Sequence, residues 1–261
     1  MHTDITRAFR NYHLFGFTGT PIFAENASSS GKANLRTTEQ AFGDQLHSYT
    51  IVDAIRDKTV LPFRVDYLNS FRVRDGIDNH DVEGIDTDSA YMNPQRISAV
   101  VSYILEHFDQ KTKRHASFQY KERRVNGFNS LFATSSIKAA RAYYQEFKRQ
   151  QADLPEARRL SVGIIYSYAP NAEAPGTGLL AEESMDPSAL SQDDRAFLDE
   201  AIADYNKQFG ASFGTDASGF EGYYTSLSTA LAERRIDLVI VVDMFLTGFD
   251  SKSLNTLWVD K

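Results

Sequence analysis

The chain has 261 residues, of which 42% are hydrophobic and 24% are charged, and its formal net charge is −7. These values are typical of a soluble globular protein with one or two domains. The sequence contains no cysteine, which excludes disulfide scaffolds, thiol catalysis and cysteine-ligated metal sites. We expect neither a signal peptide nor a membrane span, because no apolar run has the length or flanks of either. We therefore expect a cytoplasmic protein with no membrane partner.

The negative charge is concentrated in two segments. Residues 69–92 carry a net charge of −4 and residues 170–200 carry −7, whereas the rest of the chain sums to +4. A net negative charge over the whole chain argues weakly against nucleic acid as a partner. That argument loses force here, because the chain outside these two acidic segments is basic.

Two apolar segments near the amino terminus predict strands. Residues 11–17 indicate a buried strand that ends in the turn Thr18–Gly19–Thr20–Pro21. Residues 60–68 alternate partly, which favours a strand at a sheet edge because Pro62 cannot donate to a ladder. Residues 24–41 predict a loop, and the acidic segment 69–92 predicts a solvated insertion.

A helix and a basic stretch follow. Asn93 and Pro94 are an N-cap and a first helical residue, and apolar residues repeat at helical spacing as far as Phe108. Residues 111–124 are rich in Lys and Arg, interleaved with His115, Phe118 and Tyr120. This mixture is typical of a nucleic-acid backbone contact with base stacking. A solvated charged loop gives the same pattern, so both interpretations stay open.

Strands and helices alternate through the rest of the chain. Helices are predicted from Ile137, after Ser191 and around Tyr223, with a loop over residues 209–222. Apolar strands are predicted at residues 128–133, 161–168, 238–242 and 256–260. Continuous apolar strands separated by helices predict an α/β fold with a parallel sheet covered on both faces.

Three predicted strand ends carry polar turns. They are Thr18–Pro21, Thr134–Ser136 and Thr247–Asp250. Ligands of open α/β sheets bind at the carboxyl ends of strands, and hydroxyls at helix starts suit phosphate oxygens. Simple N-capping explains Thr134–Ser136 equally well. The histidines show no metal-ligand spacing and the sequence holds no phosphate-cradling P-loop, so we expect no metal-ligating residue.

Two segments, GFTGTPIF (residues 16–23) and VDMFLTGFDSK (residues 242–252), carry a resemblance to a known family. They resemble helicase motifs III and V of the restriction (motor, R) subunit of type I restriction–modification enzymes, which are superfamily two helicases. Residues 49–62 are similar to its linker into the second motor domain. Residues 132–140 resemble motif IV, and residues 254–261 resemble the strand before motif VI.

The resemblance implies a RecA-like parallel sheet with helices on both faces, which is the second helicase lobe, preceded by the tail of the first lobe. Residues 1–24 would end the first motor domain, residues 25–45 would be a linker, and residues 46–261 would form the second motor domain. Insertions would lie near residues 69–92 and 170–222.

The resemblance also implies roles for single residues. Coupling of the ATP site to DNA would belong to Thr18, Gly19, Thr20 and Pro21. Gly248 and Asp250 would lie at the nucleotide cleft. DNA contacts would come from Thr134, Ser135 and Thr247, and the basic stretch adds Lys121, Arg123 and Arg124 as candidates.

The family's full subunit uses ATP and Mg2+ to translocate double-stranded DNA, which it then cleaves, together with modification (methyltransferase) and specificity subunits. The P-loop, the Asp-Glu box, motif VI and the nuclease domain have no counterpart in this sequence. We therefore expect a fragment of such a subunit that is inactive alone and binds no cofactor. The alternative is a non-catalytic α/β nucleic-acid-binding or protein-interaction domain whose turns only cap helices.

Overall fold

The structure, a computed structural model, describes residues 7–19, 21–24, 27, 36–69, 87–166, 191–242, 244–246 and 249–260. The chain forms two compact units. Unit 1 comprises Met1–Leu68 and Asn171–Glu182, and unit 2 comprises Asn69–Pro170 and Glu183–Lys261. Within the described ranges, no helix is both long enough and apolar enough to cross a membrane.

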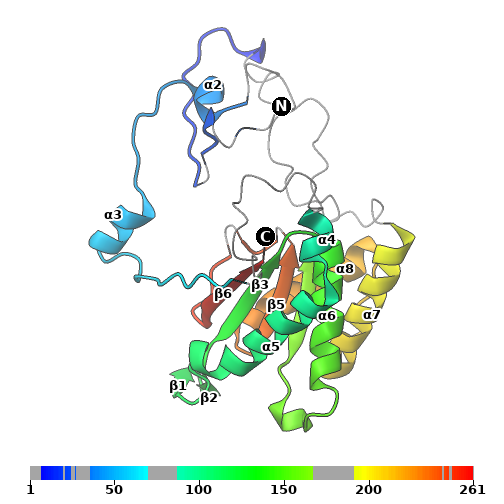
Figure 1. The fold of residues 1–261 in the computed structure, drawn as a ribbon. Helices are drawn as coiled ribbons and strands as arrows, with labels where there is room; N and C mark the ends of the chain where they lie inside the picture. Colours follow the sequence, from blue (N-terminus) through cyan, green and yellow to red (C-terminus); the bar gives the residue numbers. More distant parts are fainter. Residues whose placement is uncertain are drawn as a thin grey trace, which may run out of the picture. The chain divides into compact units, whose positions relative to one another are not determined.

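A four-stranded sheet with the order β4-β5-β3-β6 forms the centre of unit 2 (Figure 1). All its neighbouring strands are parallel, which confirms the predicted α/β fold. The strands are β3 (Asn129–Thr134), β4 (Val162–Tyr166), β5 (Leu238–Val242) and β6 (Leu254–Asp260).

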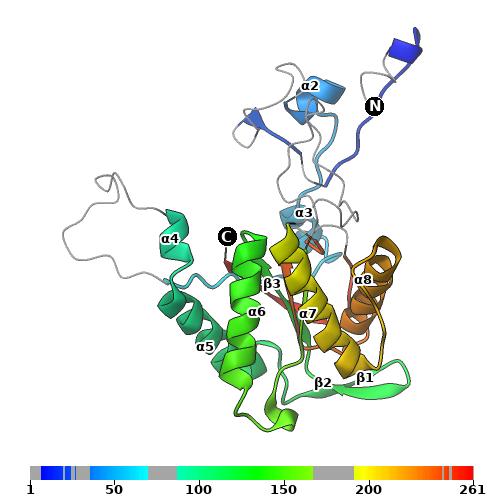
Figure 2. The same ribbon diagram turned by 90° about the vertical axis from the view of Figure 1, so that its right-hand side faces the viewer.

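Helices cover both faces of this sheet. They are α5 (Pro94–Lys111), α6 (Ile137–Gln151), α7 (Gln192–Phe209) and α8 (Ala217–Ala232), with a short α4 (Thr87–Tyr91) and the 3-10 turn η2 (Glu156–Arg158). Figures 1 and 2 show α5 and α6 on one face and α8 on the other. The predicted N-caps Asn93 and Ser191 are confirmed, since each side chain accepts a hydrogen bond from the first helical turn.

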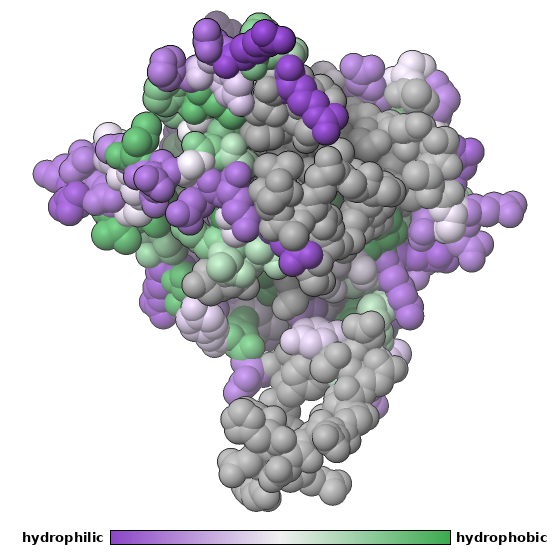
Figure 3. Space-filling model, turned by 90° about the horizontal axis from the view of Figure 1, so that it is seen from above, coloured by the Kyte–Doolittle hydropathy of each residue, from purple (hydrophilic) through white to green (hydrophobic). Residues whose placement is uncertain are grey.

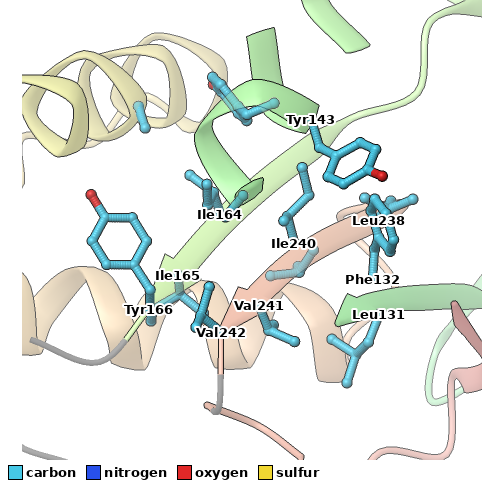
Figure 4. Packing of buried hydrophobic residues seen from close by; sticks show 14 of the residues in the cluster. Leu131, Phe132, Tyr143, Ile164, Ile165, Tyr166, Leu238, Ile240, Val241 and Val242 are labelled. Atoms are coloured by element: carbon cyan, nitrogen blue, oxygen red, sulfur yellow. The ribbon is translucent and has the colours of Figure 1, made fainter. Parts of the chain in front are cut away.

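The core lies between the helices and the two central strands, whose residues are all buried. On the α6 face, the rings of Phe132 and Tyr143 pack edge to face, with their centroids 4.7 Å apart (Figure 4). On the α8 face, β4 presents Gly163. A Cβ atom there would lie 2.9 Å from a methyl carbon of Leu227 and 2.8 Å from one of Ile236, so these side chains would have to shift to admit any larger residue.

The described part of unit 1 includes the short helices α2 (Thr38–Phe42) and α3 (Ile51–Arg56), each opened by a capping box. The predicted strands at residues 11–17 and 60–68 are wrong. The structure describes every residue in both ranges, and none of them pairs with another strand. A strand needs a neighbour for its backbone N–H and C=O groups. Here the side chains face solvent instead, and Phe17 is 97% exposed.

Apolar side chains reach the molecular surface in Figure 3, and many of the large exposed ones belong to unit 1. Ala54 is the one buried hydrophobic residue among those described in this unit. Alternating apolar residues therefore gave a strand-like pattern here without any core to bury them.

Two further predictions in unit 2 need correction. The helix expected near Tyr223 begins at Ala217, so part of the predicted loop 209–222 is helical. Its glycines serve packing, since a Cβ at Gly222 would lie 3.1 Å from the Phe213 ring. The basic stretch is also not a simple loop. It contains an antiparallel hairpin of β1 (Ser117–Tyr120) and β2 (Arg123–Asn126).

Candidate functional site at the carboxyl edge of the sheet

The turn after β3 and the loop after β5 start side by side. These strands are parallel neighbours with Ala133 opposite Val241, so both chains leave the sheet at the same edge. The Thr134 hydroxyl donates to the Val241 carbonyl oxygen at 3.4 Å, and Thr134 is fully buried. Its side chain joins the two strands, and Ser135 is the exposed hydroxyl of the turn.

Ser136 begins helix α6. Its Oγ accepts a hydrogen bond from the Ala139 N–H at 3.1 Å, which confirms the N-capping interpretation for this residue. The positive end of the α6 dipole lies in this first turn. Ser135 therefore lies next to a helix start that favours anions.

The loop after β5 is held by aromatic rings. Phe245 is buried, and its ring centroid lies 5.2 Å from that of Tyr224 on α8 and 4.8 Å from that of Phe249. Phe245 adopts φ of 60°, a left-handed conformation that costs a bulky residue about 1–3 kcal/mol and persists only where its surroundings enforce it. Thr247 and Gly248 lie outside the described residues, between these anchors. Asp250 is exposed.

A buried polar cluster at the end of β6 has no counterpart in the sequence predictions. The Arg96 guanidinium, from the first turn of α5, donates to Asp260 Oδ2 at 2.9 Å and to the Tyr143 hydroxyl at 3.2 Å. A second nitrogen of Arg96 donates to Asp260 Oδ1, and Tyr143 donates to Asp260 Oδ2. Burial, together with the hydrogen bond to Asp260, raises the pKa of Tyr143, so its hydroxyl stays a donor.

The basic candidates lie at the other end of the sheet. Strand β2 ends at Asn126, three residues before β3 begins, so the β1–β2 hairpin extends from the amino end of β3 (Figure 1), and Lys121, Arg123 and Arg124 belong to this hairpin. The six residues of β3 separate the two ends by ~20 Å, at about 3.3 Å per residue. The structure therefore does not bring these three side chains together with Ser135.

In unit 1, the segment with the predicted coupling residues is held at both ends. Gly16 lies against the Phe42 ring, where an added Cβ would be 2.6 Å from a ring carbon. The Ile22 N–H donates to Thr38 Oγ1 at 2.8 Å, and the Thr38 N–H donates to the Ile22 carbonyl at 3.0 Å. Thr18 and Gly19 are exposed between these points and Pro21 is half-buried. Thr20 lies outside the described residues.

The fit to ATP and Mg2+ is incomplete. Of the two residues expected at the nucleotide cleft, only Asp250 is described, and one exposed carboxylate cannot hold a nucleotide–metal complex. Among the residues with described positions, no three His, Asp or Glu side chains gather in a metal-binding group. No hydrolytic step is therefore assigned to this chain's own side chains.

The parallel sheet, with helices on both faces and polar turns at its carboxyl edge, defines a RecA-like helicase lobe. Comparison with known proteins supports this assignment of a helicase lobe. The sequence model of the family described as type I restriction enzyme subunit R domain 3 matches residues 126–261, and that of the SWI2/SNF2 ATPase family matches residues 1–95. The chain therefore belongs to the family of type I restriction enzyme R subunits.

Curated relatives align with the whole chain. A type I restriction enzyme endonuclease subunit of Staphylococcus aureus is 38% identical over 265 aligned residues. Another, from Staphylococcus saprophyticus, is also 38% identical over 265 aligned residues. In each case the alignment covers 100% of this chain and 26% of the relative. The chain thus spans about a quarter of the length of these curated relatives.

Proposed function

We propose that this chain is the part of an ATP-dependent restriction subunit that forms the end of the first motor domain and most of the second. The subunit would translocate double-stranded DNA with ATP and Mg2+ and cleave it, together with modification (methyltransferase) and specificity subunits. The observation that supports this most directly is the alignment of the whole chain with type I restriction endonuclease subunits at 38% identity.

Within this proposal, the carboxyl edge of the sheet in unit 2 is the surface that contacts DNA and faces the nucleotide. Ser135 and the backbone amides at the start of α6 would contact a DNA phosphate. Thr134 would position this turn through its hydrogen bond to the Val241 carbonyl oxygen. Thr247 would contact a second phosphate, with Gly248 and Asp250 facing the nucleotide cleft. Thr18, Gly19, Thr20 and Pro21 would transmit the nucleotide state to DNA, and ATP would supply the free energy for movement.

The isolated chain would hydrolyse no ATP. Phosphoryl transfer needs a phosphate cradle, a carboxylate-held metal and a charge-stabilising arginine, and the sequence carries no Gly-x-x-x-x-Gly-Lys-Ser/Thr cradle. ATP turnover by the purified 261-residue chain above that of a buffer blank would contradict this part of the proposal.

A chimera tests the function. The aligned segment of the Staphylococcus aureus endonuclease subunit would be replaced by this chain, and the product assembled with its modification and specificity subunits. We expect ATP hydrolysis that depends on unmethylated target DNA. The substitution Thr247→Ala in the chimera is expected to lower this DNA-dependent hydrolysis at least tenfold, because a hydrogen bond to a charged phosphate is worth about 1.5–3 kcal/mol and about 1.4 kcal/mol is a factor of ten.

The alternative, a non-catalytic nucleic-acid-binding or protein-interaction domain, gives a different result in the same assay. The chimera would assemble and bind DNA, as seen by size-exclusion chromatography and gel shift, yet hydrolyse no ATP. That combination would overturn the motor proposal, because assembly shows that the inserted segment has folded.

A further inference from the structure

The β1–β2 hairpin has two chemically different faces. Directly paired residues of an antiparallel ribbon share a face, and the pairs are Phe118 with Val125 and Gln119 with Arg124. Phe118 and Tyr120 are half-buried and Val125 is buried, so they form the inward face. The outward face consists of exposed polar residues: Ser117, Gln119, Arg124 and Asn126.

The aromatic side chains of the hairpin attach it to unit 2. The Phe118 ring stacks on Phe128 with a centroid separation of 4.8 Å. The Tyr120 hydroxyl donates to the Ala232 carbonyl at the end of α8 at 2.7 Å. These rings are therefore engaged in packing, and the base stacking expected from the sequence is not available to them in this structure.

The cations of the hairpin differ in their surroundings. Lys121 Nζ lies 3.3 Å from Glu233, so its charge is partly balanced. Arg124 is exposed, and its Nε donates to the Ser117 hydroxyl at 2.8 Å, which fixes the guanidinium on the outward face. Arg123 is exposed at the tip of the ribbon, where it pairs with Tyr120, so it lies on the opposite strand face from Arg124. Lys113 and His115, in the turn before β1, are exposed as well.

The ribbon is also held at its base. The Gly127 N–H donates to the Ala116 carbonyl at 2.8 Å, and Gly127 adopts φ of 59° with no space for a Cβ beside Arg114. A polar, cationic face on a ribbon anchored at its base and tip is a preorganised surface, which reduces the entropic cost of binding.

We propose that Arg124 on the outward face of the β1–β2 hairpin, together with Arg123 at its tip, is a second contact for the DNA phosphate backbone, separate from the carboxyl edge of the sheet. This rests on the proposed function, which supplies DNA as the polyanion. Because the length of β3 separates the two contacts, the hairpin meets a different stretch of the duplex from Ser135. The contact is independent of sequence, since guanidinium groups on phosphates carry no base information.

Fluorescence anisotropy with a labelled 30-base-pair duplex tests this in the 261-residue chain. We compare the parent chain with the double variant Arg123→Gln and Arg124→Gln between 50 and 200 mM salt. A phosphate contact contributes about 0.9 to the slope of log K against log salt. We expect the slope to fall by about 2 and the affinity at 100 mM salt to fall at least tenfold.

The control is the double variant Lys148→Gln and Arg149→Gln, which removes the same charge from the surface of α6. It should bind like the parent. A hairpin variant that binds like the parent, or a control that weakens binding equally, would overturn the inference. A parent chain without salt-dependent binding would also overturn it, because the hairpin is exposed in this chain. None of these results affects the ATPase test of the chimera, so failure of the two proposals can be told apart.

Discussion

Asp237 fixes the amino end of β5 through several buried contacts. Its carboxylate accepts from Arg234 at 2.8 Å and from the Ser161 N–H at 2.9 Å, and Arg114 lies 3.6 Å away. The Arg234 side chain is only 7% exposed. The substitution Asp237→Ala would leave this guanidinium buried without its counter-charge, so we expect a loss of about 3–5 kcal/mol in the free energy of unfolding, measured in urea.

Asp109 is the matched control for this variant. It also lies 3.6 Å from Arg114, but its side chain is 73% exposed. The substitution Asp109→Ala should change stability by less than about 0.5 kcal/mol. Equal effects of the two substitutions would show that burial of the ion pair is not the cause.

Three buried tyrosines predict a loss of stability at high pH. Burial raises the pKa of Tyr143, Tyr144 and Tyr223, whereas an unfolded tyrosine ionises near pH 10. Folded tyrosines therefore keep their protons after unfolded ones release them. The contribution of these tyrosines to the free energy of unfolding is complete below about pH 10. Above that pH it is lost, by up to about 1.4 kcal/mol per pH unit for each residue.

Urea unfolding between pH 9 and pH 11.5, followed by tyrosinate absorbance, measures this dependence. The Tyr144→Phe variant removes one of these groups and should reduce the slope by up to about 1.4 kcal/mol per pH unit, while the other buried tyrosines, which include Tyr205 with its pKa also raised by burial, keep their contribution. A variant slope equal to that of the parent would contradict the assignment of Tyr144.

Single residues differ in how far sequence reveals them. Asn93 and Ser191 could be predicted as N-caps because capping is decided within four residues. The pairing of Arg96 with Asp260 could not, because 164 positions separate the two residues and neither has a local pattern. The same applies to Phe245, whose φ is positive and whose ring contacts Tyr224 of α8, a residue distant in sequence.

At the scale of elements, the close approach of β4 and α8 depends on Gly163. An added methyl group would overlap Leu227 and Ile236, so Gly163→Ala should destabilise the protein by about 1–3 kcal/mol. Leu227→Ala alone should cost about 2–5 kcal/mol by leaving a cavity. The double variant should lose less than the sum in urea unfolding, because each change relieves the other. Strict additivity would contradict the steric argument.

The four strands of the parallel sheet in unit 2 were predictable, whereas the two strands predicted in unit 1 do not form. Apolar runs such as residues 128–133 and 238–242 match β3 and β5, because a strand buried on both faces must be continuously apolar. Residues 60–68 have a comparable content of apolar side chains but join no ladder. The β1–β2 hairpin was missed because its residues are mostly charged or polar, and its inward face shows only three apolar positions.

At the scale of the whole chain, the two units differ in buried core, and this predicts their resistance to proteolysis. Unit 2 buries an extended cluster of apolar side chains, whereas the described part of unit 1 buries Ala54 alone. Segments with few buried apolar contacts open locally at low cost. Limited proteolysis with mass spectrometry should therefore detect cleavage in residues 36–68 before cleavage in residues 94–166. The reverse order would contradict this prediction.

The order of the strands in the sheet also determines how long β3 lacks its partner strands while the chain is being synthesised. Strand β3 is made first of the four, yet it lies in the interior of the sheet between β5 and β6. Strand β5 begins at Leu238, about 110 residues later, so at about 5–20 residues per second a ribosome takes roughly 5–20 s to deliver it. During that time both edges of β3, a strand that is completely buried in the folded protein, have no partner strand. The nascent chain must therefore shield β3, and the helices α5 and α6, which flank it in sequence, are the first elements able to do so.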